Sequence, residues 1–171
     1  DTFDLKSVGD ISYDYIVDPP GYLDPNADDT PLGWTPTPAG THYTTINDSV
    51  RQPTVPNTAN YISAAGAGDM DAFNMSTIDL AGGTATGIAI WLYFNDVVYM
   101  SIYANGEWKT SPSILSVSAG WDYSMFTGTF NQTDIDNLQV RLISDNVPTI
   151  YAMYAEITYT PVTYLNISLN S

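Results

Sequence analysis

The sequence contains no cysteine, which excludes disulfide bonds and thiolate metal sites. Basic residues are almost as scarce. Lys6, Arg51, Lys109 and Arg141 stand against nineteen acidic residues, and the formal net charge is −15. Binding to nucleic acid or to an anionic membrane surface needs several cations clustered on one face. We therefore expect no nucleic-acid partner and no docking to membranes through a basic patch.

Histidine is scarce, and long apolar runs are absent. A Ser-His-Asp arrangement would have to use His42, the single histidine, and no Gly-x-Ser-x-Gly element lies near it. We interpret His42 as a surface or partly packed loop residue and name no catalytic residue. No segment approaches the roughly 18 apolar residues of a membrane span, so no membrane insertion is expected. We find no basic and apolar leader, and if the protein is exported we expect this to be its mature form, trimmed before Asp1.

What the sequence does contain is the pattern of an all-β domain. Apolar residues alternate with a period of two, and turn residues recur about every ten residues, which is typical of a sandwich or barrel. We predict one antiparallel β-sandwich domain over residues 1–171, with about ten strands. The expected strands are Ile11–Val17, Tyr61–Ala64, Ala72–Leu80, Thr86–Phe94, Val97–Tyr103, Ser113–Val117, Tyr123–Phe130, Leu138–Ser144, Ile150–Tyr159 and Thr163–Leu169.

Local signals add turns and one short helix. Asn95-Asp96 and Asn105-Gly106 each follow a β-rich run and predict hairpins. Thr133–Asn137 reads as a single helical turn that Thr133 would cap. Residues 19–60 hold most of the eleven prolines and have weak periodicity. We interpret this stretch as a long Pro-rich excursion lying across one sheet, with an interdomain linker as the alternative.

Short motifs in this order suggest a family. They are Asp24-Pro25-Asn26-Ala27-Asp28, Gly33-Trp34-Thr35-Pro36, Tyr43, Ile46-Asn47-Asp48, Asn60-Tyr61-Ile62 and Leu138-Gln139-Val140-Arg141-Leu142. The chain resembles the jelly-roll-like β-sandwich modules of phage structural proteins and microbial extracellular proteins over roughly residues 22–160. The resemblance implies a jelly-roll-like sandwich and an extracellular, cell-surface or virion setting. It implies no catalytic residue.

An Asp-rich segment gives the one metal signal. Asp24, Asn26, Asp28 and Asp29 place oxygen ligands at close spacing, as at the start of a calcium loop. The segment lacks the sixth-position glycine and the downstream glutamate of an EF-hand, so a solvated turn is the competing interpretation. A structural calcium ion is the only cofactor hypothesised. Gly68-Asp69-Met70-Asp71 is a weaker acidic pair.

Two further groups could carry binding or chemistry. Glu107 beside Trp108 is the best candidate for the acid of a glycosidase pair, but it follows a tight turn where it would be solvated. Trp91 and Trp34 are expected in the core. Trp108 and Trp121 lie near turns and are the candidates for stacking on a sugar ring. Sequons for glycosylation occur at Asn47, Asn74, Asn131 and Asn166.

Both ends of the chain carry β-competent sequence. Residues 1–17 and 162–171 are candidate edge or exchanged strands, which could pair internally or be donated to a neighbouring copy. The residues expected at such a subunit contact are Phe3, Leu5, Ile11, Tyr13, Leu165, Ile167 and Leu169.

Three functions follow from these observations. The first is a non-enzymatic structural subunit of an extracellular filament, fibre or virion that forms a homo-oligomer or polymer through strand pairing. The alternative is a carbohydrate-binding or adhesive surface module with a glycan partner. The third is a glycoside-active enzyme that uses Glu107.

Overall fold

The computed structural model describes residues 21–112 and 114–160. The predicted terminal strands, their subunit-contact residues and the Asn166 sequon lie outside these ranges. The described chain is all-β, as predicted, with ten strands and two five-residue helices. In order they are β1 (Gly21–Leu23), β2 (Pro25–Leu32), β3 (Thr35–Thr37), α1 (His42–Ile46), β4 (Tyr61–Ser63), β5 (Met70–Met75), β6 (Thr84–Ala104), β7 (Glu107–Thr110), β8 (Ile114–Phe130), α2 (Gln132–Asp136), β9 (Gln139–Ser144) and β10 (Thr149–Thr160).

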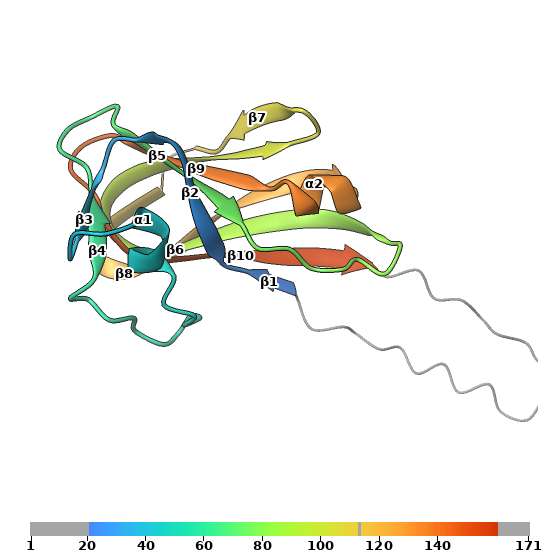
Figure 1. Ribbon diagram of the computed structural model, residues 1–171, viewed down its shortest axis with the longest axis horizontal. Helices are drawn as coiled ribbons and strands as arrows, with labels where there is room; N and C mark the ends of the chain where they lie inside the picture. Colours follow the sequence, from blue (N-terminus) through green and yellow to red (C-terminus); the bar gives the residue numbers. More distant parts are fainter. Residues whose placement is uncertain (1–20, 113, 161–171) are drawn as a thin grey trace, which may run out of the picture.

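The strands form one curled antiparallel sheet whose two halves make the layers of a sandwich (Figure 1). The first half of β6 lies between β8 and β10, and β10 also pairs with β1 and β4. The second half of β6 lies between β7 and β9, and β9 leads to β5 and β2. We call these the first and the second layer. β6 runs through both layers and connects them.

β6 passes from one layer to the other at the point where a hairpin was predicted. Asn95-Asp96 does not reverse the chain, so that prediction is wrong. The register against β8 shifts between Phe94 and Asp96, and Asp96 has φ 69°. β8 pairs with β6 on both sides of this shift, and the extra residues of the irregularity lie on β8, between Ser116 and Gly120. β6 therefore continues through Asn95-Asp96 as one strand. Asn105 and Gly106, with φ of 55° and 76°, do form the predicted hairpin turn.

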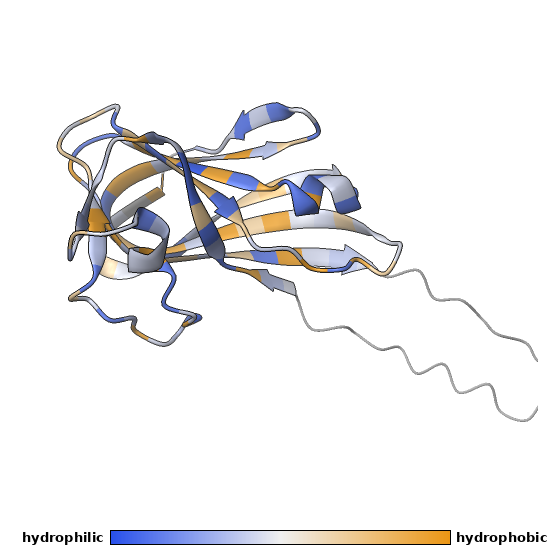
Figure 2. Cartoon of the chain, in the orientation of Figure 1, coloured by the Kyte–Doolittle hydropathy of each residue, from blue (hydrophilic) through white to orange (hydrophobic). Residues whose placement is uncertain are grey.

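The core lies between the layers and follows the alternation of β6. Ile88, Ile90, Leu92 and Phe94 point inward and are fully buried, and the even-numbered residues Val98 to Ala104 continue this inner face. Trp34 is 4% exposed and joins the same core. The odd-numbered residues of β6 from Ala89 to Tyr103 therefore point outward, whereas Ala85, before the register shift at the start of the strand, is part of the core. In Figure 2 hydrophobic residues run along β6, whereas β2 and α2 are largely hydrophilic.

The Pro-rich region is more regular than expected, because β1, β2 and β3 lie within it. β2 pairs only with β5 among the described strands, and an edge strand tolerates prolines that a central strand would not. α1 packs against β2, β3, β4 and β10, and residues 47–60 then return to β4. Among the described residues, no helix has the length and apolar character that crossing a lipid bilayer requires.

α2 matches the predicted one-turn helix with a different cap. Asn131, not Thr133, is the N-cap: its side chain accepts from the backbone N–H of Asp134, and the Asp134 carboxylate accepts from the N–H of Asn131. This reciprocal capping box gives side-chain acceptors to two backbone N–H groups in the first turn of the helix.

Candidate functional site

The outer face of the first layer carries a row of aromatic rings. The register places Tyr123 of β8, Trp91 of β6 and Tyr154 of β10 side by side. The Trp91 ring centroid lies 4.4 Å from that of Tyr123 and 6.0 Å from that of Tyr154, with interplanar angles of 31° and 11°. Tyr22 of β1 closes the row with an edge contact to Tyr154 at 5.7 Å. Near-parallel rings on neighbouring strands stabilise a sheet and also build a continuous aromatic surface.

A second row runs beside the first, two residues further along β6 and β8 and three residues further along β10. It contains Trp121 of β8, Tyr93 of β6, Tyr151 of β10 and Tyr61 of β4, with successive ring centroids 5.4, 5.9 and 6.0 Å apart. Trp121 also contacts Tyr154 at 5.4 Å and links the rows. We call the two rows together the aromatic face.

Part of the aromatic face is covered by residues 47–60, which we call the strap. The Arg51 guanidinium lies 4.5 Å from the Tyr154 ring centroid and 5.2 Å from that of Tyr22, and it forms an ion pair with Asp24 at 2.7 Å. The backbone carbonyl of Thr54 accepts a 2.8 Å hydrogen bond from the Trp121 indole. Burial under this cover raises the pKa of the Tyr154 hydroxyl. The strap thus covers Tyr154. Of the Pro-rich excursion predicted to lie across one sheet, this part does so, whereas Gly21–Leu23, Pro25–Leu32 and Thr35–Thr37 are strands of the sheet itself.

The β8 side of the aromatic face stays open. Tyr123 is 43% exposed and the neighbouring Met125 is 49% exposed, while Trp91 is half-buried between them and Tyr154. The Trp91 indole N–H donates to the Glu156 carboxylate at 2.9 Å. Because the indole donor already has a partner, this open end presents ring surface and a thioether to a ligand.

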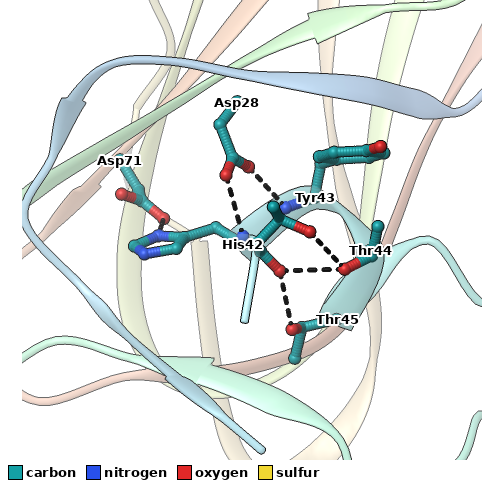
Figure 3. Close-up of polar contacts among 7 residues, drawn as sticks. Asp28, His42, Tyr43, Thr44, Thr45 and Asp71 are labelled. Carbon is teal, nitrogen blue, oxygen red and sulfur yellow. Dashed lines mark hydrogen bonds and ion pairs between the residues drawn. The ribbon is translucent and has the colours of Figure 1, made fainter. Parts of the chain in front are cut away.

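A polar cluster surrounds His42 at the start of α1 (Figure 3). The Asp28 carboxylate accepts hydrogen bonds from the backbone N–H groups of His42 and Tyr43, at 3.0 and 2.6 Å. The His42 Nδ1 lies 2.6 Å from Oδ2 of Asp71, a fully buried residue whose Oδ1 has no partner among the described residues. Burial raises the pKa of the Asp71 carboxyl to about 6, and the contact with His42 opposes the shift. The cluster fastens α1 to β2 and β5.

The residues predicted to bind calcium do not converge. Asp24 pairs with Arg51, Asp28 holds α1, and Asp29 accepts from the Gln139 amide at 2.6 Å, while Asn26 is exposed. Over residues 21–112 and 114–160, no group of three or more His, Asp or Glu side chains is placed to hold a metal ion. Each of the three carboxylates has a protein partner, and the calcium hypothesis gains no support from their positions.

The two tryptophans predicted to stack on sugars lie on different faces. Trp121 belongs to the aromatic face. Trp108 lies on the outside of the second layer, where it packs on Tyr103 at 5.5 Å and under the Arg141 guanidinium at 4.1 Å. Both are half-buried, and Trp91, which was expected in the core, faces outward. Glu107 is exposed at the edge of β7, 3.7 Å from Lys109, as its position after a turn indicated.

The three described sequons differ in accessibility. Asn131 is exposed but caps α2, whereas Asn74 and Asn47 are half-buried. Asn74 accepts from the Gln139 amide, and Asn47 donates to the carbonyl of Pro25.

Most of the aromatic face was not identified from the sequence. Tyr123 and Tyr154 alternate with inward residues on their strands, and that alternation is the available signal. Tyr151 lies at the register shift of β10 between Ile150 and Ala152, where the alternation breaks. Their convergence depends on which strands pair and in what register, which alternation alone does not specify.

No protein-family model and no curated protein matches the chain. Among solved structures, the chain is similar to insecticidal crystal protein Cry2Aa, with 10% identity and a TM-score of 0.40 over 62% of this chain and 18% of that one. It is also similar to the CBM36-1 domain of a multidomain xylanase from the hindgut metagenome of Trinervitermes trinervoides, with 13% identity and a TM-score of 0.38 over 67% and 90%. A third is a family 16 carbohydrate-binding module, with 14% identity and a TM-score of 0.30 over 61% and 78%.

Proposed function

We propose that this chain is a non-enzymatic, extracellular carbohydrate-binding module whose ligand lies on the open end of the aromatic face. The observation that supports this most directly is the exposure of Tyr123 and Met125 beside the half-buried Trp91. Pyranose rings carry C–H groups on their faces that pack against aromatic rings, and a sheet surface is flat enough to accept an extended chain.

The stability of the sheet does not by itself explain this arrangement. Cross-strand aromatic pairs contribute to a sheet when they are covered, as Tyr154 is beneath Arg51 of the strap. Tyr123 lies at the outer end of its row with close to half its surface in water. Exposed apolar clusters of this kind mark binding surfaces.

Charge selects the class of glycan. The net charge of −15 disfavours an anionic polysaccharide, and Arg51, which lies over the rings of Tyr22 and Tyr154, is already paired with Asp24. The ligand is therefore a neutral polysaccharide. Because no ion pair to the ligand is required, its affinity should change little with ionic strength.

Binding to insoluble neutral polysaccharides tests the proposal. The chain is mixed with cellulose, chitin, xylan or starch particles, and the bound fraction is measured at low and high salt. Tyr123→Ala should weaken binding about tenfold, because the ring contributes both apolar area and stacking. The control is Tyr99→Ala, which removes an outward tyrosine from the second layer.

Two results would contradict the proposal. One is no binding to any neutral polysaccharide by the folded chain. The other is equal losses for Tyr123→Ala and Tyr99→Ala, which would place the ligand elsewhere. The competing hypothesis of a filament or virion subunit depends on terminal residues outside the described ranges, and no described residue favours it.

A further inference from the structure

The second layer has a depression of about 380 Å³ at the end where β6 turns into β7. Its walls come from the β6–β7 turn, from α2 and from the start of β9. The lining residues used below are Tyr103, Asn105, Thr133, Asn137 and Gln139. A volume of this size lies in the range of small-ligand sites. The depression is on the opposite side of the sandwich from the aromatic face. The outward residues in the first half of β6 lie on the outer face of the first layer, and those in the second half lie on the outer face of the second layer.

The hydrogen bonds around the depression leave oriented acceptors. The Gln139 amide nitrogen donates to the Asp29 carboxylate at 2.6 Å and to the Asn74 side-chain oxygen at 3.0 Å. The Asp29 carboxylate can only accept, so the Gln139 amide nitrogen faces it, and the Gln139 Oε1 keeps no protein donor among the described residues. The Asn137 amide nitrogen donates to the Thr133 carbonyl at 2.8 Å, and the Asn137 Oδ1 likewise has no protein donor among the described residues.

The wall of the depression is held rigidly. The backbone N–H of Asn105 donates to the Asp134 carboxylate at 2.8 Å, and the Asn105 side chain donates to the Thr129 carbonyl at 3.3 Å. These bonds tie the left-handed turn at Asn105-Gly106 to the capping box of α2. The Tyr103 ring, packed on Trp108, supplies an apolar side. Preorganised polar groups beside a ring are what a hydroxyl-rich ligand requires.

We infer that this depression is a second binding site, which takes a single neutral sugar ring or the end of a glycan chain. The ring packs on Tyr103, and its hydroxyl groups donate to Gln139 Oε1 and Asn137 Oδ1. The site shares no residue with the aromatic face and does not depend on it. The inference therefore goes beyond the proposed function and can stand or fall separately.

An NMR titration of the full chain with soluble sugars tests the inference. Backbone amide shifts are followed while neutral monosaccharides and disaccharides are added, with glucuronate as an anionic comparison. We expect shifts confined to residues 103–106 and 133–139, and weaker binding of glucuronate beside Asp29 and Asp134. Asn137→Ala, an exposed position, should weaken the neutral sugar roughly fivefold through loss of one acceptor. The matched control is Asn146→Ala, in the turn between β9 and β10.

The outcomes separate the two sites. Shifts at 103–106 and 133–139 that persist in Tyr123→Ala support the second site even if binding to insoluble polysaccharide fails. Absence of shifts there with every sugar, or equal affinities for Asn137→Ala and Asn146→Ala, would overturn it. Shifts that vanish in Tyr123→Ala would also overturn it, because the sugar would then occupy the aromatic face.

Discussion

Replacing Asp71 by asparagine should change how stability depends on pH. Asp71 lies on β5 between Leu32 of β2 and Leu142 of β9, it is fully buried, and its Oδ1 has no partner among the described residues. Burial raises the pKa of its carboxyl from 3.8 to about 6. The folded state therefore holds the proton more tightly than the unfolded chain does.

The sign and size follow from that difference. When the folded pKa is the higher one, the free energy of unfolding falls as pH rises from about 4 to about 6, because the folded protein has to release a proton that the unfolded chain has already lost. A pKa raised from 3.8 to about 6 corresponds to a loss of about 3 kcal/mol in the free energy of unfolding by neutral pH. The free energy of unfolding of the wild-type chain should fall by this amount relative to that of Asp71→Asn, because the asparagine side chain has no proton to release.

Urea unfolding followed by tryptophan fluorescence measures the effect. The free energy of unfolding of wild type minus that of Asp71→Asn, plotted from about pH 4 to about pH 8, should decline by about 3 kcal/mol and then level off. Asp136→Asn supplies a control of opposite sign. Hydrogen bonds from Thr77 and then Gln132 lower the pKa of the exposed Asp136, so its contribution is lost as pH falls. A flat or rising difference curve for Asp71→Asn would refute the reasoning.

Two other substitutions test which local contacts stabilise the segments near the proposed sites. Asn131→Ala removes the capping box of α2 and should lower the free energy of unfolding by about 1 kcal/mol, measured by urea unfolding, whereas no loss would show that the cap is dispensable. Gly33→Ala would bring a Cβ within 2.8 Å of the Met70 carbonyl oxygen, so its melting temperature should drop, while Gly40→Ala, with nothing within 4 Å, should melt like wild type.

The fold class could be predicted because alternation is a local property. Ile88, Ile90 and Leu92 alternate with outward residues, and any sheet that buries them produces a layered β domain. The prediction failed at Asn95-Asp96, where turn-forming residues continue strand β6 instead of reversing the chain. Local propensity permits both outcomes. The pairing of β8 across the shift decides between them, and β8 begins 18 residues later in the sequence.

The candidate sites were less accessible to prediction because each is assembled across strands. Trp121 was identified as a sugar-stacking candidate from its position near a turn, but its neighbours Tyr93, Tyr154 and Thr54 come from β6, β10 and the strap. Similarly, nothing near His42 in the sequence indicates that its ring lies against Asp71, 29 residues away. Such contacts depend on register, and a shift of one residue would turn every outward ring into the core.

One strand relates the two proposed sites. Trp91 and Tyr93 of β6 belong to the aromatic face, and Tyr103 of the same strand lines the depression on the second layer. Because the core lies between the two outer faces, a flat polysaccharide surface that covers Tyr123 cannot also reach Gln139. A chain that uses both sites would hold a polymer surface on one side and a separate sugar or chain end on the other. The module would then connect two glycans, and each site would keep its affinity when the other is removed.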